Sequence, residues 1–438
     1  MRLVISLPST NQVGSRARPY FDLVSDILGR VRYRIAVRAG AAASTLSRRL
    51  GMGEGGIIGG RVTLALDPHA LSRLAAGRSV ALVSGTNGKT TTSHLLAGLL
   101  GGAGSVAHNA TGANMPDGAV AALIAAAGAR HAVLEVDELH VAAVAEAVDP
   151  QVIVLLNLSR DQLDRGSEVR GVAAALSGAL IRHPRTLVVA NVDDPMVVWA
   201  ASAAARTVWV GAGSSWSGDT RGCPRCGEAL DFTAERWRCG CGLVRPQPHW
   251  QVDHDAGTVV AGDGPPIPVP LQLPGRFNLG NAALALAAAA VLGIDPSAAA
   301  GGVAALDSVG GRYGTVQHRG HQLRLLLAKN PAGWAETLAL LEPAAARLLV
   351  VNAREADGRD TSWLWDVPFE QLAPGIGVVA AGEKAADLGL RLGYAGIDHE
   401  TVTNPLDALA RLPQGKVDVV ANYTAFRALA RQIVEGAS

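Results

Sequence analysis

Lysine and aromatic side chains are scarce in this sequence of 438 residues, and neither charge is in clear excess. Only four lysines occur: Lys89, Lys329, Lys384 and Lys416. The formal net charge is +1, and a nearly neutral chain carries no strong electrostatic footprint for nucleic acid or an anionic membrane surface. Nucleic acid is therefore not expected as a partner, and each lysine position becomes informative.

Long apolar runs are also missing. Residues 1–7 are too few for the apolar core of a secretory signal, and Pro8 interrupts them. The run 282–292 is too short to span a bilayer and predicts a buried helix. We therefore expect a cytoplasmic protein without a membrane-spanning segment, in which cysteines bind metal or react instead of forming disulfides.

All four cysteines fall within one short segment, at Cys223, Cys226, Cys239 and Cys241. Two close pairs separated by a hairpin-like stretch are typical of a zinc ribbon, in which four thiolates hold the ion tetrahedrally. Four protein ligands leave no open position, so the expected zinc is structural, in a ribbon at about residues 219–245. The second pair is one residue tighter than usual, and a redox dithiol pair is the rival interpretation.

A glycine-bearing loop at residues 85–92 is the strongest functional signal. It follows the apolar run 79–83 and precedes a helical pattern at 93–100, the context in which backbone N–H groups and a helix N-terminus bind phosphate. The standard phosphate loop has glycine where this chain has Val83. The residues expected to bind a nucleotide are Gly85, Thr86, Asn87, Gly88, Lys89, Thr90 and Thr91. A turn that binds nothing is the alternative.

Two side chains of this loop have roles that follow from their chemistry. The Lys89 ammonium is expected to reach the β- and γ-phosphates, and the Thr90 hydroxyl to ligate Mg²⁺. Glu135 ends a predicted strand, where an acid can reach that ion directly or through water. Glu135 could equally be a solvated strand end, but polar clusters at 157–164 and 191–195 end two further strands and favour a ligand-binding edge.

Strands alternate with helices along most of the chain, which predicts parallel, doubly wound sheets. A helical segment at 1–55 precedes a central domain at 56–310 and a smaller α/β domain at 311–438. In the central domain we expect strands at 131–136, 152–157, 187–191 and 207–210, with helices at 119–127 and 172–181. In the last domain we expect strands at 323–328, 348–352, 377–380 and 417–421.

Together these motifs resemble the Mur ligase superfamily and, within it, the MurT subunits of lipid II isoglutaminyl synthase. The loop 85–90, Glu135 and the strings 157–164, 191–195, 275–281 and 311–312 fall in the order that those ligases show. The cysteine ribbon and the strings 329–333, 357–366, 391–396 and 423–425 are similar to MurT subunits in particular. The resemblance implies an α/β fold, with a Mur-ligase-like central P-loop domain that carries the inserted ribbon and a smaller C-terminal domain.

The resemblance also implies ATP-dependent amidation in peptidoglycan synthesis, at the inner face of the plasma membrane. The α-carboxylate of D-Glu in the lipid II stem peptide would become an acyl phosphate, which ammonia would convert to D-isoglutamine. In that family a GatD-type glutamine amidotransferase supplies the ammonia, and an aspartate of the MurT subunit completes its Cys-His triad. Asp357 or Asp360 would carry that role here, and further nucleotide contacts are expected from Asn278, Asn281 and Arg312.

The chain departs from the Mur ligases that add an amino acid. Only some fifty residues precede the central domain, so their UDP-binding domain is not expected, and no lysine lies between Lys89 and Lys329 to be carbamylated. No cysteine lies outside the ribbon, so the chain has no Cys-His glutaminase pair of its own. A Mur-like amino-acid ligase and a nucleotide-binding scaffold subunit are the two alternatives.

Overall fold

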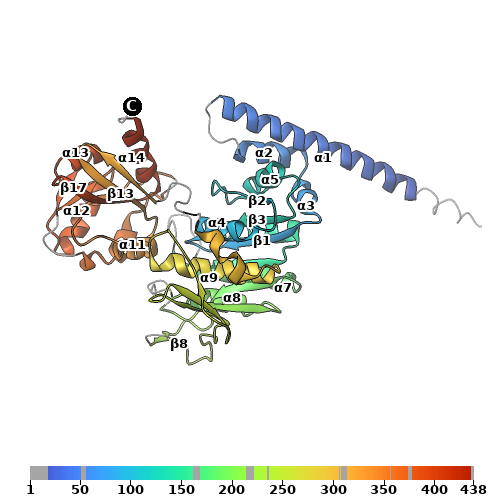
Figure 1. Ribbon diagram of the computed structural model, residues 1–438. Coiled ribbons are helices and arrows are strands. Elements are labelled where there is room, and N and C mark those ends of the chain that lie inside the picture. The colour runs from blue at the N-terminus through green and yellow to red at the C-terminus, as the bar shows by residue number, and fades with distance from the viewer. Residues whose placement is uncertain are drawn as a thin grey trace, which may run out of the picture.

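The computed structural model describes residues 18–50, 56–160, 168–213, 221–233, 236–304, 306, 313–355, 357–372 and 377–435. They form a central α/β domain, a smaller C-terminal α/β domain and a long N-terminal helix that extends past the central domain (Figure 1). Two sheets built mainly of parallel strands confirm the predicted α/β class.

A nine-stranded sheet forms the middle of the central domain, in the order β11-β10-β9-β6-β5-β4-β1-β3-β2. The pairs from β2 across to β9 are parallel, and only β9–β10 and β10–β11 are antiparallel. The strands are β1 (Ser79–Ser84), β2 (Val106–His108), β3 (His131–Glu135), β4 (Val152–Leu155), β5 (Leu187–Asn191), β6 (Thr207–Gly211), β9 (Trp250–Asp253), β10 (Thr258–Ala261) and β11 (Ile267–Pro268). The sequence did not predict β2 or β9–β11, because strands this short leave little periodicity to detect.

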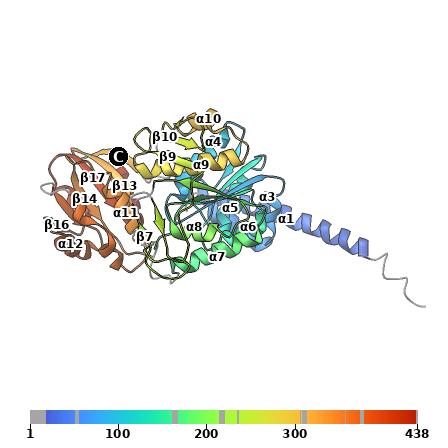
Figure 2. The same ribbon diagram turned by 90° about the horizontal axis from the view of Figure 1, so that it is seen from below.

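Helices cover both faces of this sheet, as Figure 2 shows from below. They are α2 (Gly56–Leu66), α3 (Ala70–Ala75), α4 (Lys89–Gly101), α5 (Pro116–Ala125), α6 (Val141–Val148), α7 (Val169–Arg182), α8 (Pro195–Ala201), α9 (Arg276–Val291), α10 (Pro296–Ala299) and the 3₁₀ helix η2 (Ala300–Val303). Apolar side chains of α4 and α9 share one core with the sheet, and those of α5–α8 share another. Residues 278–289 of α9 are all buried, so the predicted buried helix is confirmed.

The C-terminal domain repeats this design at a smaller scale. Its sheet has the order β12-β13-β17-β14-β15-β16, and all pairs except β12–β13 are parallel. The strands are β12 (Tyr313–His318), β13 (His321–Leu327), β14 (Ala346–Val350), β15 (Val378–Ala381), β16 (Glu400–Val402) and β17 (Gly415–Ala421). The helices are α11 (Pro331–Leu338), η3 (Ser362–Asp366), η4 (Phe369–Gln371), α12 (Ala385–Tyr394), α13 (Pro405–Leu409) and α14 (Tyr423–Glu435).

The N-terminal helix α1 (Arg18–Arg49) packs against α2 through small residues. A Cβ at Gly40 would lie 2.0 Å from the Thr63 hydroxyl oxygen and 2.6 Å from the Gly59 carbonyl oxygen. Only glycine allows two helices to approach this closely. The predicted domain limit at residue 55 therefore falls between two helices that pack together. No helix among the described residues is both long and apolar enough to cross a membrane.

A buried ion pair joins β13 to β17 in the C-terminal domain and generates a stability prediction. The Asp418 carboxylate accepts hydrogen bonds from Arg324 Nε at 2.6 Å, from Arg324 Nη2 at 2.8 Å and from the Glu342 N–H at 2.7 Å. Burial lowers the pKa of Arg324, but its bond to Asp418 outweighs burial and raises that pKa above the usual value. Arg324 therefore keeps its positive charge well above neutral pH.

Asp418→Asn is expected to lower the free energy of unfolding by about 3 kcal/mol, because it leaves a half-buried guanidinium without its counter-charge. Urea denaturation followed by circular dichroism measures this loss. Lys416→Gln is the matched control, because Lys416 lies in the same strand as Asp418 and forms an exposed ion pair of 2.9 Å with Glu342. Breaking that pair should lower the free energy of unfolding by at most about 1 kcal/mol. Equal losses for both variants would contradict the assignment.

Candidate active site

The loop between β1 and α4 requires glycine at two positions. Gly85 and Gly88 have φ of 140° and 85°, a region that residues with a side chain rarely adopt. A Cβ at Gly88 would lie 2.7 Å from Asn281 Oδ1, and one at Gly85 would lie 2.8 Å from Leu156 Cβ. No side chain caps α4, whose N-cap is Gly88, so the first N–H groups of the helix are suited to an anion.

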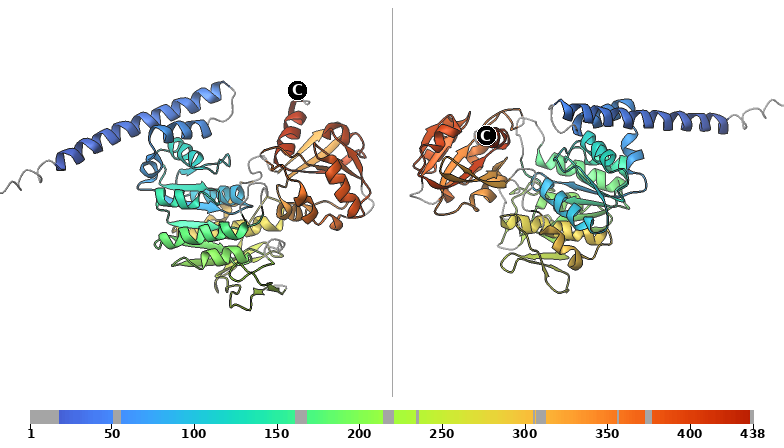
Figure 3. Two further views of the ribbon diagram at one scale, coloured as in Figure 1. Left: turned by 180° about the vertical axis from the view of Figure 1, so that it is seen from behind. Right: turned by 45° about the horizontal axis from the view of Figure 1, so that its top comes forward.

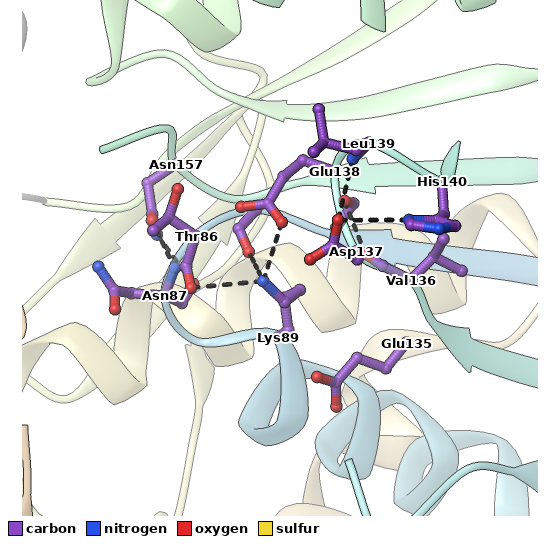
Figure 4. A network of polar contacts seen from close by, with 12 residues as sticks. Thr86, Asn87, Lys89, Glu135, Val136, Asp137, Glu138, Leu139, His140 and Asn157 are labelled. Carbon is purple, nitrogen blue, oxygen red and sulfur yellow. Dashed lines mark hydrogen bonds and ion pairs between the residues drawn. The ribbon is translucent and has the colours of Figure 1, made fainter. Parts of the chain in front are cut away.

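Polar residues that follow β4 hold this loop in place. The Asn87 N–H donates to Asn157 Oδ1 at 2.9 Å, and Asn157 Nδ2 donates back to the Asn87 carbonyl at 3.0 Å. The Thr86 hydroxyl accepts from the Ser159 N–H at 3.0 Å. Figure 4 shows Thr86, Asn87 and Asn157 gathered at this point. Backbone and side chain of the loop are thus fixed by one neighbouring strand end.

Lys89 is buried at the first position of α4, with its ammonium between the loop and a carboxylate (Figure 4). Nζ donates to the Gly85 carbonyl at 2.5 Å and to Glu138 Oε2 at 3.1 Å. Burial lowers the pKa of Lys89, but Glu138 and Glu135 outweigh it, so the pKa lies above its usual value. Lys89 therefore presents a permanent positive charge at the loop. The sequence did not identify Glu138 as its partner.

Thr90 and Glu135 meet behind the loop. The Thr90 hydroxyl donates to Glu135 Oε2 at 2.7 Å, and the Glu135 carboxylate is buried at the end of β3. Asn109 fixes the Glu135 backbone by accepting from its N–H and donating to its carbonyl, each at 2.8 Å. Hydroxyl and carboxylate oxygens in contact are the ligand type that Mg²⁺ prefers, so the residues present fit the expected ion.

The loop opens into a cleft of about 220 Å³ between the two α/β domains. On the central side it is lined by Thr86–Lys89, Thr91 and Glu135 together with Asn278 and Asn281 of α9, and apolar Leu273, Pro274, Phe277 and Leu284 form one end. Asn281 Nδ2 donates to Asn278 Oδ1 at 3.2 Å. The structure thus brings these predicted nucleotide-binding residues to one cavity. Arg312 and the string 161–164 lie outside the described residues.

The C-terminal domain forms the opposite wall of the cleft and touches the loop directly. Asn87 Nδ2 donates to Asn330 Oδ1 at 3.2 Å, and the same oxygen caps α11 by accepting from the Gly333 N–H at 3.0 Å. Lys329 also lines this wall. An Arg160–Asp366 ion pair of 3.1 Å bridges the domains nearby. Lys329 and Asn330 stood out in the sequence as a motif, but only the fold places them opposite the loop.

Asp357 and Asp360 occupy different environments. Both Asp357 oxygens accept bonds from Thr424, one from its N–H at 2.9 Å and one from its hydroxyl, which anchors the start of α14. Asp360 is exposed, and its Oδ1 accepts from the Ser362 N–H at 2.8 Å, which lowers the pKa of its carboxyl. Of the two residues, Asp360 is exposed and Asp357 is partly buried.

The four cysteines form one compact cluster, as the sequence predicted. Their Sγ atoms lie within 4.8 Å of one another, with Cys223–Cys241 at 3.6 Å and Cys226–Cys239 at 3.5 Å. Tetrahedral zinc with Zn–S bonds of about 2.3 Å separates its sulfurs by roughly 3.8 Å, so the cluster fits the ion. The cysteines flank the hairpin of β7 (Asp231–Phe232) and β8 (Trp237–Arg238).

The ribbon packs on the segment that follows β5, and that segment lines the cleft. Trp237 Nε1 donates to the Val192 carbonyl at 2.9 Å, and Arg245 pairs with Asp193 at 2.9 Å. The neighbouring Asp194 accepts from the Leu158 N–H at 2.7 Å and caps α8. The ribbon therefore supports a segment that contacts the residues holding the phosphate loop.

Purified protein is expected to contain about one zinc per chain, measured by plasma mass spectrometry. Cys239→Ser should remove most of that metal and lower the thermal midpoint, because the remaining thiolates no longer complete a tetrahedral site. Glu228→Gln, an exposed position of the same ribbon without a thiol, is the control. Metal-free protein with an unchanged midpoint in the cysteine variant would exclude a structural ion.

Lys89→Met is expected to weaken binding of Mg-ATP at least tenfold, since charge-assisted hydrogen bonds to phosphate are lost. Isothermal titration calorimetry measures the affinity. Lys384→Met provides the matched control, because Lys384 is exposed and pairs with Asp387 in the C-terminal domain. Unchanged affinity in the Lys89 variant would show that nucleotide does not bind at this loop.

Comparison with known proteins agrees with this geometry. Residues 83–221 match the Mur ligase middle domain, and residues 327–426 match the MurT ligase C-terminal domain. The lipid II isoglutaminyl synthase (glutamine-hydrolyzing) subunit MurT of Staphylococcus aureus is 29% identical over 92% of this chain and 98% of its own length. The same subunit of Streptococcus pneumoniae is also 29% identical, over 91% of this chain and 98% of its own length.

Solved structures show the same fold. A pseudomurein peptide ligase type C from Methanothermus fervidus superposes with a TM-score of 0.66 at 20% identity, covering 85% of this chain and 81% of that one. The two matched domains contain the phosphate loop and the wall opposite it. The chain therefore belongs to the Mur ligase superfamily as a ligase homologous to its MurT subunits.

Proposed function

We propose that this chain is the ATP-dependent ligase subunit of a lipid II isoglutaminyl synthase, which amidates the D-Glu α-carboxylate of the stem peptide in peptidoglycan synthesis. One observation carries the proposal: a phosphate loop and a MurT-type C-terminal wall share one cleft and touch through Asn87 and Asn330. Homology to MurT subunits over nearly the whole chain supports the substrate class.

The first step would activate the carboxylate. A carboxylate oxygen attacks the γ-phosphorus of ATP, the bond to the β-phosphate oxygen breaks, and ADP leaves behind an acyl phosphate. Lys89 and the uncapped start of α4 would neutralise charge on the transferred group, which is the main demand of phosphoryl transfer. Mg²⁺, when bound at Thr90 and Glu135, would add a further positive charge.

The second step would replace phosphate by nitrogen. Ammonia attacks the carbonyl carbon, phosphate leaves with the electrons of the C–O bond, and the nitrogen loses one proton to give the amide. Lys329 lines the cleft wall opposite the phosphate loop, and Asn330 joins that wall to Asn87. Lys329 would hold the substrate carboxylate against the γ-phosphate, because the transfer requires the two groups to be aligned.

Ammonia would come from a partner glutaminase of the GatD type. We propose Asp360 as the residue that serves the partner's Cys-His pair, because it is the exposed carboxylate of the two and stays ionised. Trp365 and Tyr394 of the same domain are 52% and 73% exposed, with ring centroids 5.2 Å apart. Exposed aromatic residues are typical anchors of protein interfaces, so this surface suits the partner.

The decisive experiment separates ligase activity from glutaminase activity. The chain alone, with lipid II, Mg-ATP and ammonium chloride, should form the amide and release phosphate, which mass spectrometry and a phosphate assay detect. Amino-acid addition in place of amidation would support a Mur-like amino-acid ligase. Nucleotide binding with no product under any nitrogen source would support a scaffold subunit.

Asp360→Asn is expected to reduce glutamine-driven amidation by the chain and its partner at least a hundredfold, and to leave ammonium-driven amidation within about twofold. A carboxylate that orients a catalytic histidine contributes on this scale, whereas it has no part in activating the substrate. Asp357→Asn is the matched comparison. Selective loss in that variant instead would transfer the role to Asp357.

A further inference from the structure

Helix α1 carries a second apolar face, opposite the one that packs on the protein. Its packed side includes the buried small residues Ala36, Gly40 and Ser47, together with Tyr33 and Val37, which pack against the core of the central domain. Ile27, Val31 and Ile35 recur every four residues about half a turn away at 100° per residue, and each is 49–57% exposed. Leu28 and Leu46 extend the same face and are also exposed. These five side chains are termed the outer face.

The outer face cannot rotate into the core. A Cβ at Gly59 would lie 1.9 Å from the Ser44 hydroxyl and 2.8 Å from the Gly40 carbonyl oxygen, so the α1–α2 contact has no room for larger residues. The close glycine contact fixes which side of α1 faces inward. Figures 1 and 3 show α1 running along the edge of the central domain and past it.

Arginines interleave with the outer face. Residues 27–50 contain six arginines and no acidic residue, although the whole chain has a net charge of only +1. Arg34 and Arg38 lie along the same side of the helix as Val31, by their spacing. Arg32, by contrast, pairs with buried Asp67 at 2.9 Å and so points to the protein body. The near-zero net charge of the whole chain therefore gives no indication of this basic segment.

We propose that the outer face of α1, with Arg34 and Arg38, docks on a membrane surface rich in anionic phospholipid. Exposed aliphatic side chains flanked by arginines fit the boundary between head groups and acyl chains. A second copy of this chain is the weaker occupant, because two-fold pairing through this face would bring Arg34 and Arg38 toward the same arginines of the other copy. The inference rests on the proposed function, whose substrate is lipid-linked, and would hold the cleft near that substrate.

Vesicle co-sedimentation of the full chain tests this inference. Vesicles of phosphatidylcholine with 30 mol % phosphatidylglycerol should bind the protein, vesicles of pure phosphatidylcholine should bind it far less, and added salt should weaken binding. Arg34→Gln with Arg38→Gln should lower the partition coefficient by roughly 25-fold, about fivefold for each arginine. Val31→Gln with Ile35→Gln should lower it at least tenfold.

A matched double variant on α7, Ile181→Gln with Arg182→Gln, removes an equally exposed apolar and basic pair and should leave binding unchanged. Because all these positions are exposed, the thermal midpoint should not move. Equal binding by all variants, or no binding to anionic vesicles, would overturn the proposal. A dimer that dissociates on Val31→Gln with Ile35→Gln would assign the outer face to self-association and overturn it as well.

Activity separates this inference from the proposed function. Ammonium-driven amidation of a water-soluble stem-peptide substrate should be equal in the wild type and the α1 variants, and only the reaction on lipid II in vesicles should slow. If the proposed function is wrong, neither substrate is amidated while vesicle binding still reports on α1. If the inference is wrong, both substrates react equally in every variant.

Discussion

The rest of the structure depends on the contacts by which neighbouring elements hold the phosphate loop in place. Glycine at 85 and 88 lets the loop lie against Leu156 and Asn281, and the reciprocal Asn87–Asn157 bonds tie it to the end of β4. With the loop fixed, α4 begins without a side-chain cap and its dipole is left for an anion. Lys89 can then stay buried and charged, because carboxylates at the end of β3 and in the turn after it compensate its burial.

The same loop organises the rest of the molecule around one cleft. Asn87 reaches across to Asn330, whose oxygen also caps α11, so the C-terminal domain is aligned by the residues that would grip the nucleotide. In the same domain, Asp360, Trp365 and Tyr394 are exposed. Behind the cleft, the cysteine ribbon supports the segment after β5. The proposed sites for nucleotide, substrate and partner therefore lie on elements that are linked through this loop and this cleft.

Local patterns in the sequence predicted the strand–turn–helix of the loop, the cysteine cluster and most strands to within a few residues. Pairings set by the fold were not predictable. Which acid among residues 135–138 faces Lys89 depends on the turn after β3, and the answer, Glu138, has no signal of its own. The different environments of Asp357 and Asp360 depend on Thr424, which lies 67 residues along the chain from Asp357. The outer face of α1 was not predicted, because the net charge of the whole chain is near zero although residues 27–50 are basic.

The most direct test follows one oxygen atom. Stem-peptide substrate labelled with ¹⁸O in the D-Glu α-carboxylate, incubated with the chain, Mg-ATP and ammonium, should release inorganic phosphate that carries one ¹⁸O. That oxygen forms the bond to the γ-phosphorus and leaves with it when ammonia attacks the carbonyl. Amide formation with unlabelled phosphate, or with ¹⁸O in AMP, would show that the loop does not activate the carboxylate by γ-phosphoryl transfer.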